Sequence, residues 1–276
     1  GHRSVNQESM PRFHVIIPAR FGSTRFPGKP LVKIAGREMV LRVVDQALRS
    51  GAASVAVATD DDRIIAAVSD QKLPRVEAIR TRVDHPSGSD RVMEAAEEMA
   101  LDNDALIINV QGDEPLIPPE AIRQVATLLA QAPEVGAATL SEPISRAEDL
   151  FNPNVVKVVS DVTGRALYFS RAPIPHAREQ FGGRDAPPSR LSEASVEKGL
   201  WQRHIGIYGY RLATLAEFVA LPVATLEATE SLEQLRLLAN GITLAVAPSI
   251  VPMPGGIDTP EDLARVEALL SASANP

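Results

Sequence analysis

Short apolar runs alternate with amphipathic segments along the first half of the chain. The predicted strands are Phe13–Ile17, Ser54–Ala58, Arg75–Arg80 and Asp104–Val110. The predicted helices between them, where apolar residues recur every three or four positions, are Glu38–Ser50, Asp61–Ser69 and about Asp90–Leu101, with Ser89 as the N-cap of the last. This β-α-β rhythm indicates an α/β fold whose central strand, Asp104–Val110, belongs to a parallel sheet.

The pattern changes in the second half of the chain. After a predicted helix over Ile117–Ala130 and a strand over Gly136–Leu140, two strand-like runs around Gly164 are typical of an antiparallel hairpin. The segment Arg171–Leu200 is rich in Pro, Gly and charge and predicts a long, partly mobile connection. The later predicted elements are a strand over Trp201–Tyr210, a helix over Glu227–Asn240, a strand over Thr243–Ala247 and a C-terminal helix capped by Thr259.

Composition narrows the class of protein. The 276 residues are 45% hydrophobic and 23% charged, as in an ordinary globular protein. The net charge of −7 argues against a nucleic-acid binder, which needs an excess of Lys and Arg, and the lack of cysteine excludes disulfides and thiolate metal sites. No apolar run approaches a membrane span and the start lacks a secretion signal, so we expect a cytoplasmic protein. Residues 1–11 are expected to be a disordered tail or a cloning remnant.

A basic loop follows the first predicted strand. Arg20, Arg25 and Lys29 lie among Gly22 and Gly28, which allow close backbone approach to an anion. Ligands of open parallel sheets bind outside the carboxyl ends of the strands, so this loop is placed to receive a polyphosphate. Its spacing fits neither the P-loop nor the dinucleotide fingerprint. A solvated surface loop is the alternative interpretation of these residues.

Other polar residues also lie at the ends of predicted elements. Asp113 follows the central strand and Asp258 precedes the C-terminal helix, where a carboxylate can hold a divalent cation that bridges phosphates; an ordinary turn residue is an equal alternative. The Ser87–Ser89 turn offers backbone N–H groups to an anion or a base edge. His204 and Tyr208 share one face of an alternating strand and could hold a hydroxylated acid or simply cover a half-wet sheet.

Eight motifs occur in the order found in the 3-deoxy-manno-octulosonate cytidylyltransferases, also called CMP-Kdo synthetases. The motifs are Pro18–Lys29, Asp84–Arg91, Asn109–Pro115, Asn152–Lys157, Tyr168–Arg171, Arg203–Arg211, Leu232–Arg236 and Asp258–Leu263. The chain resembles this family from about Phe13 to Leu270. It is individual over residues 175–200 and around Glu230, which leaves the roles of these positions open.

The resemblance implies a nucleotide-diphospho-sugar transferase fold, which is Rossmann-like: a mostly parallel mixed sheet with helices on both faces. It implies a nucleotide-binding half over residues 12–140, an antiparallel elaboration for sugar binding and dimerisation over 141–211, and a C-terminal part, 212–276, that completes the single α/β domain. The implied reaction converts CTP and Kdo into CMP-Kdo and pyrophosphate for lipopolysaccharide biosynthesis, in a homodimer, without nucleic acid or membrane partners.

The resemblance also implies roles for individual residues. The implied catalytic residues are Arg20, Lys29, Asp113 and Asp258, the last two as ligands of Mg²⁺, the expected cofactor. The implied CTP-binding residues are Ala19, Arg20, Ser23, Arg25, Lys29, Ser87, Gly88, Ser89, Arg91 and Asp113. The implied Kdo-binding residues are Arg82, Gln111, His204, Tyr208, Glu233 and Gln234. The helical pattern alone would place Glu233 and Gln234 in solvent.

Two other functions compete with this interpretation. A sibling cytidylyltransferase, acting on sialic acid or methylerythritol phosphate, would share the first loop but is not expected to carry the Arg203–Arg211 and Leu232–Arg236 motifs. A non-catalytic nucleotide-binding regulator would have little reason to keep both Asp113 and Asp258. The sequence has all of these features, so it favours the Kdo enzyme.

Overall fold

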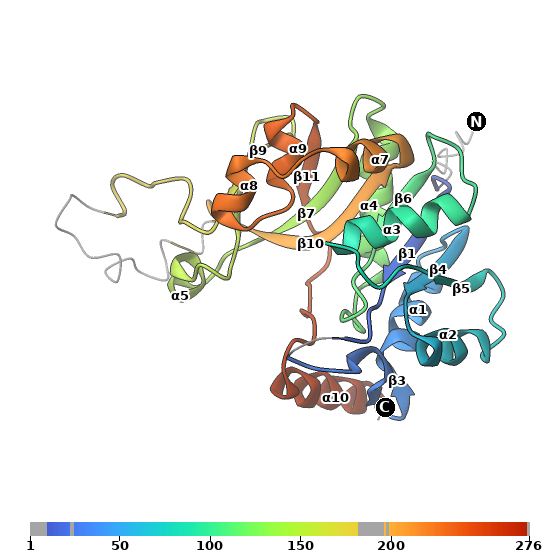
Figure 1. Ribbon diagram of the computed structural model, residues 1–276. Helices are drawn as coiled ribbons and strands as arrows, with labels where there is room; N and C mark the ends of the chain where they lie inside the picture. Colours follow the sequence, from blue (N-terminus) through green and yellow to red (C-terminus); the bar gives the residue numbers. More distant parts are fainter. Residues whose placement is uncertain (1–9, 23–24, 182–195, 197–198, 275–276) are drawn as a thin grey trace, which may run out of the picture.

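One mixed sheet organises the computed structural model, which describes residues 10–22, 25–181, 196 and 199–274. Its nine strands in the described part of the chain run in the order β11 (Leu244–Pro248), β7 (Ala137–Pro143), β10 (Gln202–Arg211), β6 (Leu106–Asn109), β1 (Phe13–Pro18), β4 (Ser54–Thr59) and β5 (Val76–Arg80), with β8 (Lys157–Ser160) on β10 and β9 (Ala166–Ser170) on β8 (Figure 1). The sheet confirms the predicted α/β class.

Strand direction changes where β10 enters the sheet. The pairs β6–β1, β1–β4, β4–β5 and β11–β7 are parallel, whereas β10 runs antiparallel to both β6 and β7. The predicted hairpin is the antiparallel pair β8–β9, which continues the sheet from one end of β10. The carboxyl end of β6 therefore lies beside β10, with Asn109 opposite Tyr208, and β1 follows as the next strand.

Helices cover both faces of the sheet, as predicted. Along β1, Val15 and Ile17 join one apolar core while Ile16 joins the other, because successive side chains of a strand point to opposite faces. The first core is shared with α1 (Met39–Arg49), α2 (Asp62–Ser69) and α4 (Pro119–Gln131), and the second with α3 (Gly88–Glu98), α7 (Leu212–Ala220) and α9 (Leu235–Ala239). The central strands are buried on both sides, which explains their continuous apolar runs.

Two helix predictions are wrong in detail, and one helix was not predicted. The helix α3 begins at Gly88, and the N-cap is Ser87 rather than Ser89. The helix α7 was not predicted, because its apolar residues are not confined to one stripe. The single helix predicted over Glu227–Asn240 is two short helices, α8 (Thr225–Glu230) and α9, separated at Ser231, whose φ of 54° is left-handed.

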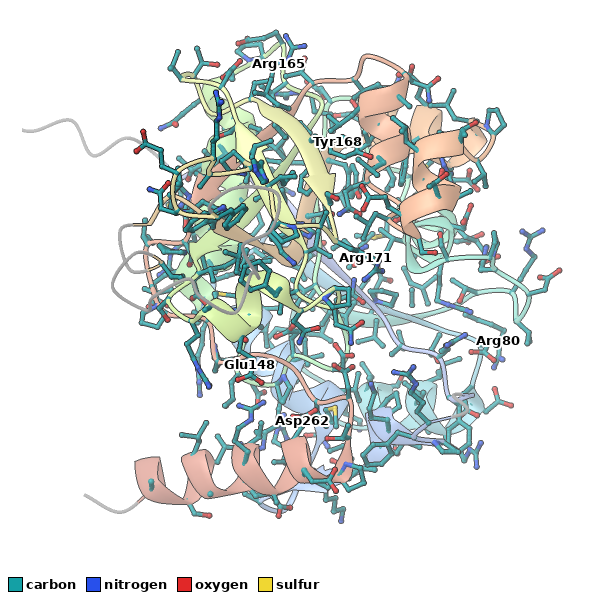
Figure 2. All side chains as sticks on the ribbon, turned by 90° about the vertical axis from the view of Figure 1, so that its left-hand side faces the viewer. Arg80, Glu148, Arg165, Tyr168, Arg171 and Asp262 are labelled. Carbon is teal, nitrogen blue, oxygen red and sulfur yellow. The ribbon has the colours of Figure 1, made fainter. Side chains whose placement is uncertain are left out.

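A C-terminal strap, residues 249–259, crosses from β11 to the last helix, α10 (Pro260–Ala274). Figure 2, which labels Asp262 in the first turn of α10, shows this helix along the bottom of the molecule. Its Val266 packs with Ile257 of the strap and with Ile34 of β2 (Lys33–Ile34), which pairs with β3 (Arg37–Glu38). The Thr259 hydroxyl accepts a hydrogen bond from the Asp262 N–H at 3.2 Å, so Thr259 caps the helix as predicted.

The expected long connection, Arg171–Leu200, lies largely outside the described residues, as do residues 1–9 of the expected tail. Trp201, directly after this connection, is fully buried beside Leu150 of α5 (Ala147–Phe151). Its Nε1 donates to the carbonyl of Pro175, a described residue of the connection, at 2.9 Å. Among the described helices, none combines the length and apolar character needed to cross a bilayer.

Candidate functional site

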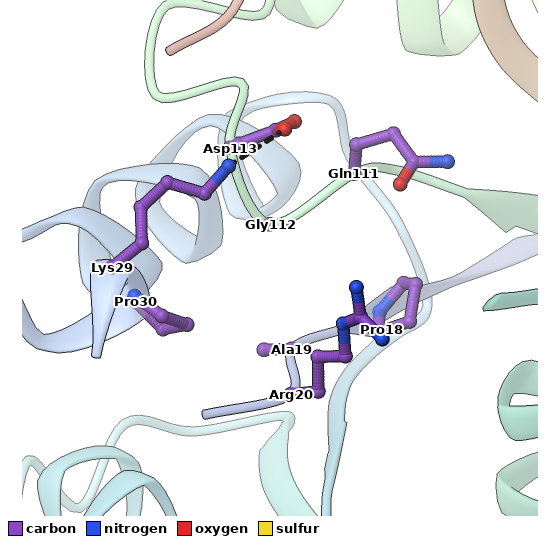
Figure 3. Close-up of a pocket in the computed structure, with 8 residues that line it drawn as sticks. All are labelled: Pro18, Ala19, Arg20, Lys29, Pro30, Gln111, Gly112 and Asp113. Carbon is purple, nitrogen blue, oxygen red and sulfur yellow. Dashed lines mark hydrogen bonds and ion pairs between the residues drawn. The ribbon is translucent and has the colours of Figure 1, made fainter. Parts of the chain in front are cut away.

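A polar pocket lies at the carboxyl ends of β1 and β6, where the basic loop leaves the sheet. It is lined by Pro18, Ala19, Arg20, Lys29, Pro30, Gln111, Gly112 and Asp113 (Figure 3). The loop is closed by a hydrogen bond from the Gly28 N–H to the Phe21 carbonyl at 3.0 Å, with Gly28 at a φ of 71° that glycine tolerates. The pocket therefore combines cations and a carboxylate at a sheet edge.

Lys29 ties the basic loop to Asp113 and to the C-terminal strap. Its Nζ donates to Asp113 Oδ2 at 3.1 Å and to the Ile257 carbonyl at 3.0 Å, and Figure 3 shows the side chain reaching the carboxylate. The Ile257 N–H in turn donates to the Asp113 carbonyl at 2.8 Å. The strap is thus docked on the 111–114 loop one residue before Asp258.

The charge of Asp258 acts on Asp113. Burial raises the pKa of the Asp113 carboxyl, the Lys29 ammonium opposes this shift, and the Asp258 carboxylate adds to it. Two carboxylates that repel each other beside one ammonium form a site that a divalent cation would stabilise. The structure brings together the two acids that the sequence separates.

The residues present fit a Mg²⁺ ion that is shared with a nucleotide. Within the described part of the chain, no group of three or more His, Asp or Glu side chains is arranged to hold a metal. Mg²⁺ is usually bound through only one or two carboxylates, with phosphate oxygens and waters completing its octahedron. Asp113 and Asp258 supply this number of hard oxygen ligands.

A second pocket meets the first at Gln111. It is lined by Gly88, Ser89, Asn109, Gln111, Tyr208, Tyr210, Phe218, Glu233 and Gln234. Three buried atoms of its wall, Asn109 Oδ1, Tyr208 OH and Glu233 Oε1, have no hydrogen-bond partner among the described residues. Buried polar atoms in native proteins are normally paired, so this convergence indicates a site for a ligand rich in hydrogen-bonding groups.

A third hollow links the other two around the start of α3. Its lining residues are Pro18, Arg20, His85, Pro86, Ser87, Gly88, Arg91 and Gln111. The Ser87 hydroxyl accepts from the Asp90 N–H at 3.3 Å, which caps the helix. Buried Arg91 donates to Thr81 Oγ1 at 2.6 Å and to the Arg82 carbonyl at 2.8 Å, so it also fixes the loop before the helix.

Several predicted site residues lie outside the linings of these pockets. The Arg82 side chain is 71% exposed, and its Nε lies 3.6 Å from Glu94 Oε1. Arg25 is also exposed. His204 lies behind Tyr208, with its Nε2 3.1 Å from Thr139 Oγ1 and its ring edge-on to Phe169. Ser23 lies outside the described residues. The remaining implied CTP and Kdo residues line one of the three pockets, and Asp258 adjoins the first.

Lowering the pH from 7 to 5 is expected to destabilise the protein partly through His204. Burial lowers the pKa of His204 to about 3, whereas the unfolded side chain titrates near 6.5, so the unfolded state takes up the proton first. The His204 contribution is complete above pH 6.5 and falls by about 2 kcal/mol between pH 6.5 and 5. Urea unfolding at both pH values measures this loss, and a His204→Gln variant with the wild-type pH slope would contradict it.

Asn109 and Glu114 are polar residues of the site region that were not predicted. Asn109 is a polar residue in an otherwise apolar central strand, a signal that could have identified it. Glu114 lies under the strap, and burial together with the charges of Asp113 and Asp258 raises its pKa to about 7. No sequence signal pointed to Glu114, because its burial depends on the remote strap.

The comparisons with known proteins agree with one another. A family model described as "Cytidylyltransferase" matches residues 14–244. The chain is 51% identical over 258 residues to a 3-deoxy-manno-octulosonate cytidylyltransferase from Alcanivorax borkumensis, covering 94% of this chain and 98% of the relative. A protein of the same name from Pseudomonas syringae pv. syringae is also 51% identical, with 94% and 98% covered.

A solved structure gives the same result at the level of the fold. It is titled as CMP:2-keto-3-deoxy-manno-octonic acid synthetase complexed with CTP, and it superposes with a TM-score of 0.82 at 38% identity. The superposition covers 95% of this chain and 100% of the solved one. The mixed sheet and its helical layers are therefore shared over nearly the full length of the chain.

Proposed function

Because the chain belongs to the 3-deoxy-manno-octulosonate cytidylyltransferase family, a family of nucleotidyltransferases, we propose that it transfers CMP from CTP to Kdo. The observation that supports this most is a pair of adjoining pockets. Cations and Asp113 line the first pocket, unpartnered polar atoms line the second, and Gln111 lines both. A triphosphate suits the first pocket, and a polyhydroxylated acid suits the second.

In the proposed reaction, the anomeric hydroxyl oxygen of Kdo attacks the α-phosphorus of CTP in line. The new bond joins this oxygen to the α-phosphorus. The bond from the α-phosphorus to the oxygen that bridges it to the β-phosphorus breaks, and pyrophosphate leaves with that oxygen. The hydroxyl proton passes to water. In such a transfer the protein positions the reactants and neutralises charge, and no side-chain nucleophile is required. Arg20 and Lys29 would hold the phosphates, with Ser23 and Arg25 assisting.

The other roles follow from the pockets. Ala19 and the start of α3 would enclose the cytidine, and Gln111, Tyr208, Glu233 and Gln234 would orient the sugar. Asp113 and Asp258 would hold Mg²⁺, which when bound lowers the pKa of a coordinated hydroxyl and offsets phosphate charge. Arg82 would pair with the Kdo carboxylate and His204 would support Tyr208; reaching the sugar would require Arg82 to leave Glu94. Three further expectations stay predictions: a homodimer, a cytoplasmic location and a role in lipopolysaccharide biosynthesis.

The test is pyrophosphate release from CTP and Mg²⁺ with a panel of acceptors: Kdo, 8-amino-Kdo, sialic acid and methylerythritol phosphate. Kdo is expected to give the highest kcat/KM, with a cytidylylated product of matching mass and one pyrophosphate for each product molecule. No release without an acceptor is expected. A clear preference for sialic acid or methylerythritol phosphate, or nucleotide binding without turnover of any acceptor, would overturn the proposal.

A further inference from the structure

Two of the family-like motifs have no part in the pockets: Asn152–Lys157 and Tyr168–Arg171. Lys157 is fully buried, and its Nζ donates to the carbonyls of Asn152 at 2.8 Å, Val155 at 2.5 Å and Arg171 at 2.8 Å. All three ammonium donors are therefore used. Lys157 holds the end of the β8–β9 hairpin, where Arg171 begins its own contacts.

Arg171 joins this hairpin to the break between α8 and α9. Its Nε donates to the Glu230 carbonyl at 2.6 Å and its Nη2 to the Ser231 carbonyl at 3.1 Å. The Glu230 carboxylate returns the contact by accepting from the Arg171 N–H at 2.9 Å and from the Ser170 hydroxyl at 2.8 Å. Figure 2 shows Tyr168 and Arg171 on the hairpin beside the helices of this region.

These contacts account for the helix that the sequence predicted and the structure lacks. In a continuous helix, the carbonyls of residues 230 and 231 would accept from the N–H groups of 234 and 235. Here Arg171 occupies both carbonyls, and the Leu235 N–H bonds to Leu232 instead, at 3.2 Å. Ser231 is held in a left-handed conformation that a non-glycine residue adopts only at a cost.

The break determines where two wall residues of the second pocket lie. Glu233 and Gln234 follow it directly and line that pocket with Tyr208. Arg236, in α9, donates from Nε to Glu227 Oε1 at 2.8 Å and from Nη2 to Glu227 Oε2 at 2.7 Å. These two hydrogen bonds connect α9 to α8. Arg171 from the hairpin and Arg236 from within thus hold the same turn from two sides.

We infer that Arg171 is a positioning residue for the acceptor pocket: by taking the carbonyls of Glu230 and Ser231 it keeps residues 230–234 out of a helix and turns Glu233 and Gln234 toward the acceptor. This rests on the proposed function, because it assigns the second pocket to the sugar. Arg171 lines none of the three pockets. Its effect is therefore on acceptor binding and not on the phosphate site around Lys29.

Steady-state kinetics of Arg171→Ala test the inference. The KM for Kdo is expected to rise by about tenfold, the loss typical of hydrogen bonds from a charged group, while the KM for CTP stays at the wild-type value. Arg171→Lys keeps the charge but lacks the forked guanidinium that spans two carbonyls. It is therefore expected to show most of the same rise in the KM for Kdo. Arg165→Ala removes an exposed arginine of the same hairpin and serves as the matched control, with wild-type constants.

A second-site variant separates positioning from general stability. Glycine adopts the left-handed conformation without strain, so adding Ser231→Gly to Arg171→Ala is expected to lower the KM for Kdo again. Arg171→Lys, a milder change that also cannot span the two carbonyls, provides the same readout if Arg171→Ala does not fold. Equal rises in both KM values, an unchanged KM for Kdo, or no rescue by Ser231→Gly would overturn the inference.

Hydrogen exchange over residues 225–240 tests the same inference without turnover. Arg171→Ala is expected to change the exchange of amides 230–235, whereas Arg165→Ala leaves it unchanged. Wild-type protein that does not convert CTP and Kdo would refute the proposed function, and exchange would then decide the positioning by itself. Unaltered exchange in folded Arg171→Ala would refute the positioning even if the wild-type enzyme is active.

Discussion

Asp113→Asn is expected to lower kcat for pyrophosphate release from CTP and Kdo by about 10³-fold, the scale of losing one preorganised charged group. Asparagine keeps the shape of the side chain but removes the charge that would hold the cation. It also removes the negative charge beside the Lys29 ammonium, which keeps its hydrogen bond to the Ile257 carbonyl. Lys29 would then be free to follow the phosphates without its counterion.

The same variant is expected to remain folded. Burial raises the pKa of Asp113, which means that the folded protein disfavours the ionised carboxyl, so a neutral amide relieves this penalty. The free energy of unfolding should stay within about 1 kcal/mol of wild type. Asp70→Asn, at an exposed aspartate that ends α2, is the matched control. Near-wild-type activity of Asp113→Asn in saturating Mg²⁺ would rule out the metal role.

Gly256→Ala is expected to lower kcat by about 100-fold, as displacement of catalytic groups by about 1 Å does in enzymes. A Cβ at this position would lie 2.9 Å from the Asp113 carbonyl oxygen and 3.2 Å from Glu114 Oε1. The strap would have to lift, which stretches the 2.8 Å hydrogen bond from Ile257 to Asp113 and moves Asp258 away from Asp113.

Kinetics and urea unfolding of Gly256→Ala separate this effect from a general loss of stability. The added methyl should cost roughly 1–3 kcal/mol of unfolding free energy, too little to unfold a typical domain. Pro252→Ala changes an exposed residue of the same strap and should behave as wild type. A fully active Gly256→Ala enzyme would show that the close docking of the strap is not needed for transfer.

Most strands could be predicted from the sequence, because a strand that is buried on both faces is a continuous apolar run. Ser54–Thr59 and Leu106–Asn109 are continuous apolar runs bounded by polar residues, and each lies within one or two residues of its expected position. The basic loop and Asp113 were also placed correctly at the carboxyl edge, because they follow strands directly in the chain.

What the sequence missed depends on contacts between remote segments. The break at Ser231 is set by Arg171, about 60 positions earlier, so the local pattern could indicate only a helix. The same break brings Glu233 and Gln234 into a pocket, although their spacing predicted solvent. The approach of Asp258 to Asp113 depends on Lys29 and Gly256, which no local pattern connects.

The most direct test of the account is whether Asp113 and Asp258 serve one shared metal-nucleotide complex. Initial rates with CTP, Kdo and saturating Mg²⁺ are measured for Asp113→Asn, Asp258→Asn and the double variant. Residues that act as a unit are not additive, so the double variant is predicted to be no slower than the slower single variant. A double variant whose rate falls by the product of the two single losses would mean that the two carboxylates act independently, and it would contradict the account.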